Sequence, residues 1–263
     1  MIVPLTWLKE YIDITQSPEE VARVFTSIGY MLDRPITQVE GDTIIDLEVR
    51  QNRSDCLSLI GLARELGAAL GRPMRLPESA ESLGESAGKT RIDIPEPDLC
   101  PRFFGLTFEG ITVKESPDWM KKRLAAYGIK SINNVVDITN YVATELGMPL
   151  HAYDADKVAD RHLIIRNAHQ GESLVLFGGK HVSFTEDDII HADATGPVGF
   201  GALMGGEEKS VHPETTSIIL EAAVYNQGSV RRSSRRHSIR TEASTRLEKF
   251  MHPYLVEIAL KRA

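Results

Sequence analysis

The sequence predicts an α+β fold in two parts, a small N-terminal α+β unit followed by a larger mixed α/β domain. Within the first 72 residues, helix signals flank a segment in which apolar and acidic residues alternate. Short β runs broken by glycine pairs fill residues 164–220. A stretch rich in proline and small polar residues lies between the two parts. We therefore expect the N-terminal unit at 1–72, a linker at 73–97 and the larger domain at 98–263.

The first helix signal begins at Ser17. Ser17 suits the N-cap, Pro18 suits the first helical position, and Glu20 completes a capping box. Gly29 ends the apolar repeat that follows. Residues 43–49 then alternate apolar and acidic side chains, which is typical of a strand with one solvated face.

A second helix is expected after Ser54 and Asp55, either of which suits the cap, and Gly71 follows its last apolar residue. The linker comes next. It has four prolines around a small-polar stretch with little to bury, although residues 90–94 have the composition of a short strand.

The larger domain opens with a predicted strand at 103–111. Two helices follow, one from Ser116 to Gly128 and one over 135–146. The series of β runs comes after them, and an amphipathic helix is expected at 253–263.

The composition excludes several classes of protein. With 42% hydrophobic and 25% charged residues, the chain has the composition of an ordinary globular protein, and no apolar run is long enough to span a membrane. The two cysteines, Cys56 and Cys100, are too far apart for a metal-ligand motif, and we expect a cytoplasmic location. No H-E-x-x-H pair or P-loop is present, so we expect no metal and no cofactor in this chain.

Five arginines lie between positions 231 and 240, although the whole chain has a net charge of −7. Such a concentration of guanidinium groups is typical of an anion site, and phosphate is the usual ligand. The small residues Thr241 and Ala243 follow directly and suit the wall of a tight pocket. A solvated basic face is the alternative. The arginines are Arg231, Arg232, Arg235, Arg236 and Arg240.

Four further residues are candidates for a site. His151 follows an expected turn after a helix, and it serves equally as a loop histidine with a backbone hydrogen bond. Glu221 ends an apolar run, so it either meets a ligand or pairs with a nearby arginine. Gly205 and Gly206 either let the backbone approach a ligand or form a bulge.

Several long motifs in order resemble the N-terminal part of the β subunit of bacterial phenylalanyl-tRNA synthetase. One of them is N-R-S-D-C-L-S-L-I-G-L-A-R-E at 52–65. The others lie at 4–11, 134–142, 149–154, 204–207 and 240–244. The short segment between Asp33 and Ile44 leaves no room for the OB-fold domain that this family commonly inserts, and the family's C-terminal domains have no counterpart here.

The resemblance implies an editing domain that hydrolyses tyrosine wrongly esterified to phenylalanine tRNA. It implies that Glu221 recognises the tyrosine hydroxyl with a backbone group of Gly205, and that Thr241 and Ala243 line the amino-acid pocket. His151 and Asn140 match residues beside the scissile ester. The implied partners are phenylalanine tRNA and the synthetase α subunit, and ATP and Mg²⁺ belong to the synthetic site elsewhere in that family.

No Ser-His-Asp order or cysteine nucleophile is evident, which favours attack by a positioned water. Two other functions stay open from the sequence. One is a non-catalytic scaffold and tRNA-binding portion of the synthetase, and the other is a nucleic-acid-binding module without an amino-acid pocket.

Overall fold

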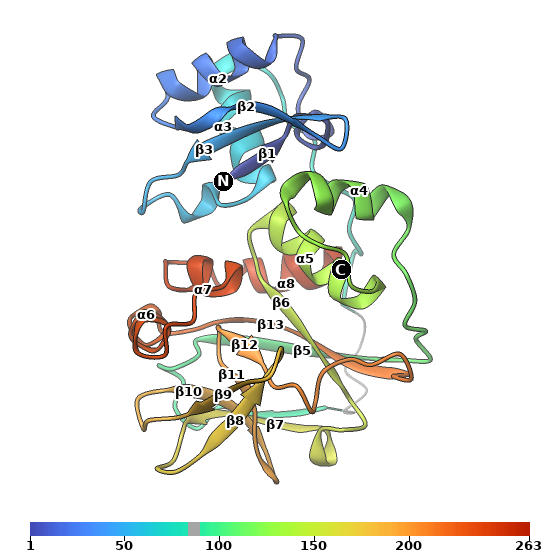
Figure 1. Ribbon diagram of the computed structural model, residues 1–263, viewed down its shortest axis with the longest axis vertical. Helices are drawn as coiled ribbons and strands as arrows, with labels where there is room; N and C mark the ends of the chain where they lie inside the picture. Colours follow the sequence, from blue (N-terminus) through green and yellow to red (C-terminus); the bar gives the residue numbers. More distant parts are fainter. Residues whose placement is uncertain (84–89) are drawn as a thin grey trace. The chain divides into compact units, whose positions relative to one another are not determined.

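The computed structural model describes residues 1–83 and 90–263 (Figure 1). Its contacts divide the chain into two compact units. The first contains residues 1–79, 115–147 and 262, and the second contains 80–114, 148–261 and 263. The expected linker at 73–97 includes residues 84–89, which lie outside the described part.

The first unit is built on a three-stranded antiparallel sheet in the order β1-β3-β2. Its strands are β1 (Ile2–Pro4), β2 (Met31–Val39) and β3 (Asp42–Glu48). Its helical elements are α1 (Leu5–Leu8), α2 (Pro18–Ser27), η1 (Ser54–Cys56), α3 (Leu59–Leu70), α4 (Asp118–Tyr127) and α5 (Asn134–Leu146).

Helices α4 and α5 belong to this unit because α5 packs on α3 and α4 packs on β1. The fully buried Trp7 of α1 stacks on Tyr141 of α5, with ring centroids 4.5 Å apart. The expected start of the larger domain at residue 98 does not match this division. Apolar faces more than a hundred residues apart in the sequence share one core in the first unit.

Of the two helix N-caps predicted in the first unit, one is confirmed and one is wrong. The capping box predicted for α2 is confirmed, since Ser17 accepts from the N–H of Glu20 and Glu20 accepts from the N–H of Ser17. The cap predicted for the second helix is wrong. Ser58 caps α3 by accepting from the N–H of Gly61, because residues 54–56 form a separate 3₁₀ turn.

The described residues of the second unit form three sheets. The first has the order β5-β13-β6 and the second the order β12-β11-β10-β7-β4, in which β4 is parallel to its neighbour and the other pairs are antiparallel. A hairpin of β8 and β9 forms the third. The strands are β4 (Arg91–Asp93), β5 (Arg102–Glu109), β6 (Leu150–Asp154), β7 (His162–Asn167), β8 (Ser173–Leu176), β9 (Lys180–Ser183), β10 (Ile189–Asp193), β11 (Gly196–Phe200), β12 (Met204–Gly205) and β13 (Ser217–Val224).

Strand β13 is the centre of the first of these sheets, and every residue along it is buried. Its apolar run therefore fits a central strand with both faces covered. Helical elements complete the unit, namely η2 (Ala159–Arg161), α6 (Gln227–Arg236), α7 (Glu242–Leu247) and α8 (Leu255–Arg262). The combination of helices with mainly antiparallel sheets confirms the α+β class. Among the described residues, no helix is long and apolar enough to cross a membrane.

Candidate active site

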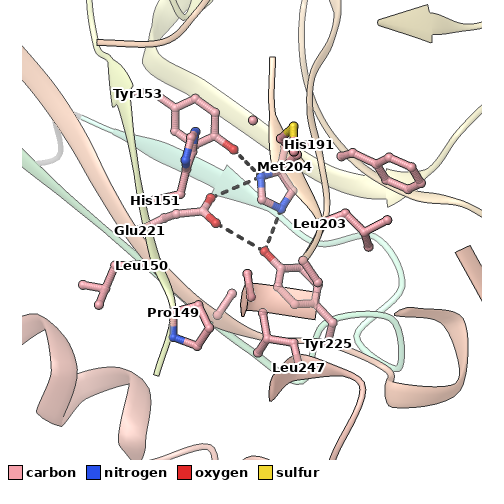
Figure 2. A pocket seen from close by; sticks show the side chains of 15 residues that line it. Pro149, Leu150, His151, Tyr153, His191, Leu203, Met204, Glu221, Tyr225 and Leu247 are labelled. Carbon is pink, nitrogen blue, oxygen red and sulfur yellow. Dashed lines mark hydrogen bonds and ion pairs between the residues drawn. The ribbon is translucent and has the colours of Figure 1, made fainter. Parts of the chain in front are cut away.

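A cavity of about 90 Å³ lies in the second unit (Figure 2). Strands β6, β10, β11, β12 and β13 and helix α7 all contribute to its wall. It therefore draws on segments far apart in the sequence. The lining residues are Pro149, Leu150, His151, Tyr153, His191, Phe200, Ala202, Leu203, Met204, Gly205, Glu221, Ala223, Tyr225, Ala243 and Leu247.

The register of the β6–β13 ladder brings the two leading candidates together. His151 is paired directly with Glu221, and residues opposite each other in an antiparallel pair have their side chains on the same face. Tyr153 and Ala223 lie two residues further along the two strands, so they share this face and line the same cavity.

This register corrects two expectations. His151 lies on strand β6 and not on a turn, because residues 150–154 form the edge of the sheet. Glu221 lies in the middle of β13 and not at the end of a strand. Of the two alternatives for Glu221, pairing with an arginine does not occur among the described residues, and Nδ1 of His191 lies 3.1 Å from Oε2 instead.

Glu221 belongs to a polar group buried in the cavity wall, with His191, Tyr153 and Tyr225 (Figure 2). Tyr225 donates to Oε1 of Glu221 at 3.4 Å, and its hydroxyl lies 2.7 Å from Nε2 of His191. The hydroxyl of Tyr153 is hydrogen-bonded to Nδ1 of His191. These linked contacts fix the position of the Glu221 carboxylate.

Two buried atoms in this cavity lack a hydrogen-bond partner among the described residues. They are Oε2 of Glu221 and Nε2 of His151. The 3.1 Å contact of Oε2 with His191 is an ion-pair distance without hydrogen-bond geometry. Buried polar atoms are nearly always satisfied, so two unsatisfied ones in one cavity indicate a place for a polar ligand or water.

The electrostatic balance keeps Glu221 ionised. Burial raises the pKa of the Glu221 carboxyl, but the interactions with His191, His151 and Tyr153 together outweigh burial, and the net pKa is below its ordinary value. Burial, reinforced by the Glu221 charge, raises the pKa values of Tyr153 and Tyr225 well above the ordinary phenol value, so both remain hydrogen-bond donors. Burial also lowers the pKa of His151, which is therefore a neutral imidazole near neutral pH.

Gly205 is required by the position of His151. A Cβ atom built on Gly205 would lie 2.3 Å from Cε1 and 2.5 Å from Nε2 of the His151 ring. Any other residue at this position would displace the imidazole. The glycine signal in the sequence is therefore explained by close packing against His151.

Ala243 and Leu247 of helix α7 form part of the apolar wall. Thr241 is the N-cap of that helix and is not among the lining residues. Its hydroxyl accepts from the N–H of Ser244 and donates to the carbonyl of Leu203 at 3.0 Å. Thr241 thus joins α7 to the cavity segment that contains Leu203.

Asn140 is not among the residues that line this cavity. It lies on α5, in the first unit, whereas every lining residue belongs to the second unit. Its expected role beside the ester stays a prediction.

The arginines at 231–236 lie on helix α6, and all are exposed. They differ in their partners. Arg236 contacts the buried carboxylate of Asp188 at 2.7 Å and also pairs with Asp187. Within the described chain, Arg231 and Arg235 have no ion pair, and they lie one turn apart on the helix. Arg232 donates to Ser229, and Arg240 lies 3.7 Å from Glu248.

Only one group of possible metal ligands occurs within residues 1–83 and 90–263, formed by Asp55, Cys56 and Glu65. The guanidinium of Arg53 lies 2.9 Å from Asp55 and 2.8 Å from Glu65. These carboxylates already have a cation between them, so the cluster does not resemble a metal site.

The sequence did not single out His191, Tyr153 or Tyr225. Tyr153 carried a usable signal, because it is two residues from His151 and a strand places both on one face. His191 and Tyr225 carried none. They are 34 residues apart in the sequence, and only the folded chain brings their side chains together.

Every residue that lines the cavity lies in the part of the chain that a family model matches. The model of the B3/4 domain matches residues 99–263. The chain belongs to this family.

The relatives extend the similarity to most of the chain. It is 40% identical, over 84% of its length, to the phenylalanine–tRNA ligase beta subunit of Nitratidesulfovibrio vulgaris, of which it covers 28%. It is 35% identical, over 100% of its length, to that of Rhodopirellula baltica, of which it covers 39%. The chain therefore spans well under half the length of these relatives.

A solved structure is also similar, an N-terminal fragment of the phenylalanyl-tRNA synthetase beta-subunit from Pyrococcus horikoshii. The match covers 85% of this chain and 67% of the other, at 17% identity and a TM-score of 0.47. This likeness is too distant to carry a statement about individual residues.

Proposed function

We propose that this chain is the editing part of a phenylalanine–tRNA ligase beta subunit, which hydrolyses tyrosine esterified to phenylalanine tRNA. The observation that carries the proposal is the unpartnered Oε2 of Glu221, which lies on an ionised carboxylate in a small cavity with mainly apolar walls. A phenol hydroxyl is the neutral donor that such an acceptor fits.

The carboxylate gives the site its preference for tyrosine over phenylalanine. Tyrosine supplies the missing hydrogen bond to Glu221, whereas phenylalanine would leave a buried charged acceptor unsatisfied. An apolar synthetic pocket rejects an added hydroxyl by only about 100-fold, so a second site that selects the hydroxyl corrects the remaining error.

The lining residues favour direct hydrolysis by water. None of the fifteen is serine, threonine, cysteine or lysine, so none supplies the usual nucleophile of a covalent intermediate. The water oxygen attacks the ester carbonyl, the bond to the ribose oxygen breaks, and that oxygen leaves as a hydroxyl. Neutral His151, whose Nε2 is unpartnered, is suited to accept a hydrogen bond from this water.

The exposed Arg231 and Arg235 are suited to the phosphate backbone of the tRNA, because no ion pair within the described residues engages them. The synthetase α subunit as a partner, and a cytoplasmic location, are further parts of the proposal. They rest on the similarity to ligase beta subunits.

The test is deacylation of tyrosyl-tRNA and phenylalanyl-tRNA, both made with phenylalanine tRNA, by the purified chain. We expect faster release of tyrosine than of phenylalanine. Binding of the tRNA without release of either amino acid would favour the scaffold alternative and overturn the hydrolytic proposal.

A further inference from the structure

His191 has no role in the proposal above, yet it is the most connected polar side chain of the cavity. It is 3% exposed and contacts Tyr153, Tyr225 and Glu221 through its two ring nitrogens. Its imidazole also stacks on the Tyr225 ring at a centroid distance of 5.8 Å. A side chain held from so many sides keeps one orientation.

We propose that His191 is a positioning residue that holds the Glu221 carboxylate so that Oε2 faces the ligand hydroxyl. This inference rests on the proposed function of the cavity. It assigns the amino-acid selectivity to a group of four side chains in which His191 joins the other three.

The hydrogen-bond directions support this assignment. Tyr225 donates its one hydrogen to Oε1 of Glu221, so its oxygen is left to accept from Nε2–H of His191 at 2.7 Å. On the other side of the ring, Nδ1 lies 3.1 Å from Oε2. The Tyr153 hydroxyl is hydrogen-bonded to this same nitrogen, so the ring is held between both tyrosines and the carboxylate.

The resulting arrangement occupies Oε1 and leaves Oε2 beside Nδ1 of His191 but without a hydrogen bond. The two oxygens are therefore not equivalent. The Tyr225 contact fixes one, and the other stays an acceptor for a ligand. Without His191, the carboxylate would lose its electrostatic partner and the buried charge would be costly to keep.

A glycine on the neighbouring strand is needed for the same group. Gly199 is paired with His191 across the β10–β11 ladder. A Cβ atom on Gly199 would lie 2.9 Å from the Tyr153 hydroxyl and 3.6 Å from Nδ1 of His191. The absence of a side chain at Gly199 thus allows the Tyr153 hydroxyl to reach His191.

A double-mutant cycle tests whether His191 acts through Glu221. The preference to measure is the ratio of tyrosyl-tRNA to phenylalanyl-tRNA hydrolysis, together with the affinity ratio for free L-tyrosine and L-phenylalanine by calorimetry. We expect His191→Ala to lower both ratios by about tenfold. In the Glu221→Ala background, the same change should alter neither ratio by more than about twofold. An equal loss in both backgrounds, or no loss in either, would overturn the inference.

Two further variants guard against a general folding defect. His191→Gln keeps a donor and should retain part of the tyrosine preference, and Gly199→Ala should lower the preference by displacing the Tyr153 hydroxyl. His181→Ala, at an exposed position on β9, is the matched control and should change nothing. Equal losses of preference in His191→Gln and His191→Ala would contradict a role for the donor.

Nitrogen NMR of the labelled chain gives a readout that needs no substrate. The ring-nitrogen shifts of His191 should change in Glu221→Gln and stay the same in His181→Ala, because Nδ1 of His191 lies 3.1 Å from Oε2 of Glu221. If the chain shows no tyrosine preference but this response occurs, the proposed function fails and the positioning of Glu221 by His191 stands. No response of His191 to Glu221→Gln would overturn the positioning role.

Discussion

His151 and Glu221 are directly paired across the β6–β13 ladder, and each presents an unpartnered buried atom to one cavity. Their electrostatic states are complementary, because the pKa shifts leave the histidine neutral and the carboxylate ionised. One face of the sheet thus carries both an unpartnered carboxylate oxygen and an unpartnered imidazole nitrogen.

Replacing Glu221 with alanine tests the selectivity. A hydrogen bond to a charged group contributes about 1.5–3 kcal/mol, so the ratio of tyrosyl to phenylalanyl ester hydrolysis should fall by roughly 10- to 150-fold. The loss should come mainly from slower hydrolysis of the tyrosyl ester. An unchanged ratio in the deacylation assay would show that another group recognises the hydroxyl.

Replacing Gly205 with alanine tests the position of His151. The added Cβ would lie 2.3 Å from the imidazole, so the ring must move. A displacement of about 1 Å costs on the order of 100-fold in rate, and we expect this loss with both esters. Gly228→Ala is the control, because its Cβ would meet only side-chain ends, those of Arg232 at 3.1 Å and Asn226 at 3.3 Å. Normal hydrolysis by Gly205→Ala would exclude His151 from the reaction.

Replacing Ala243 with tryptophan should fill the cavity. The cavity volume of about 90 Å³ leaves no space for an indole ring beside the side chain of a bound amino acid. Hydrolysis of both esters should be lost while the affinity for tRNA, measured by filter binding, stays within about twofold of the original. A parallel loss of tRNA affinity would place Ala243 in the nucleic-acid surface instead.

The arginines of α6 should separate into two groups. Changing Arg231 and Arg235 to glutamine should weaken tRNA binding, and the slope of log affinity against log salt should become shallower by about one for each phosphate no longer neutralised. Arg236→Gln should instead lower the free energy of unfolding, by about 1–3 kcal/mol, because Arg236 satisfies the buried Asp188. Identical salt slopes for the double variant and the unmodified chain would show that Arg231 and Arg235 do not contact phosphate.

Asp188 should make stability depend on pH in the acid range. Burial alone raises the pKa of this carboxyl, but hydrogen bonds from Ser233, Thr185 and His237 outweigh burial and lower it. Since the native pKa is below the unfolded value of about 3.9, the contribution is complete above that pH and is lost as pH falls toward the native pKa.

The measurement for Asp188 is chemical denaturation of the chain and of Asp188→Asn at several pH values. Near neutral pH the variant should be less stable by about 3 kcal/mol, because it leaves buried donors without their charged acceptor. The difference should shrink below about pH 4. A constant difference down to about pH 3 would mean that Asp188 keeps its charge throughout that range.

Local signals allow much of the secondary structure to be predicted. The capping box at Ser17 and the glycines after α3, α4 and α5 mark helix ends that the structure has within a few residues. The sequence nevertheless predicts α4 and α5 as parts of the larger domain, whereas both pack in the first unit. Which core a helix face joins depends on contacts between distant segments, and the periodicity of one helix contains no information about its partner.

The family resemblance places four of its implied residues at this cavity, but not Thr241 or Asn140. Glu221, His151, Gly205 and Ala243 all line the cavity. His191 is not predictable, because its partners Tyr153 and Tyr225 are 38 and 34 residues away in the sequence. Only the pairing of β10 with its neighbours makes these separations short in space.

The alternation of side chains along β13 restricts the changes that this gene can accumulate. Glu221 faces the cavity because it is in register with His151, and its neighbours Leu220 and Ala222 point to the opposite face. Deleting or inserting a single codon within 217–220 would shift that register by one residue and turn the carboxylate away from the cavity. A substitution in β13 therefore alters one position, whereas a change in its length before Glu221 alters the face of every side chain between the change and Glu221.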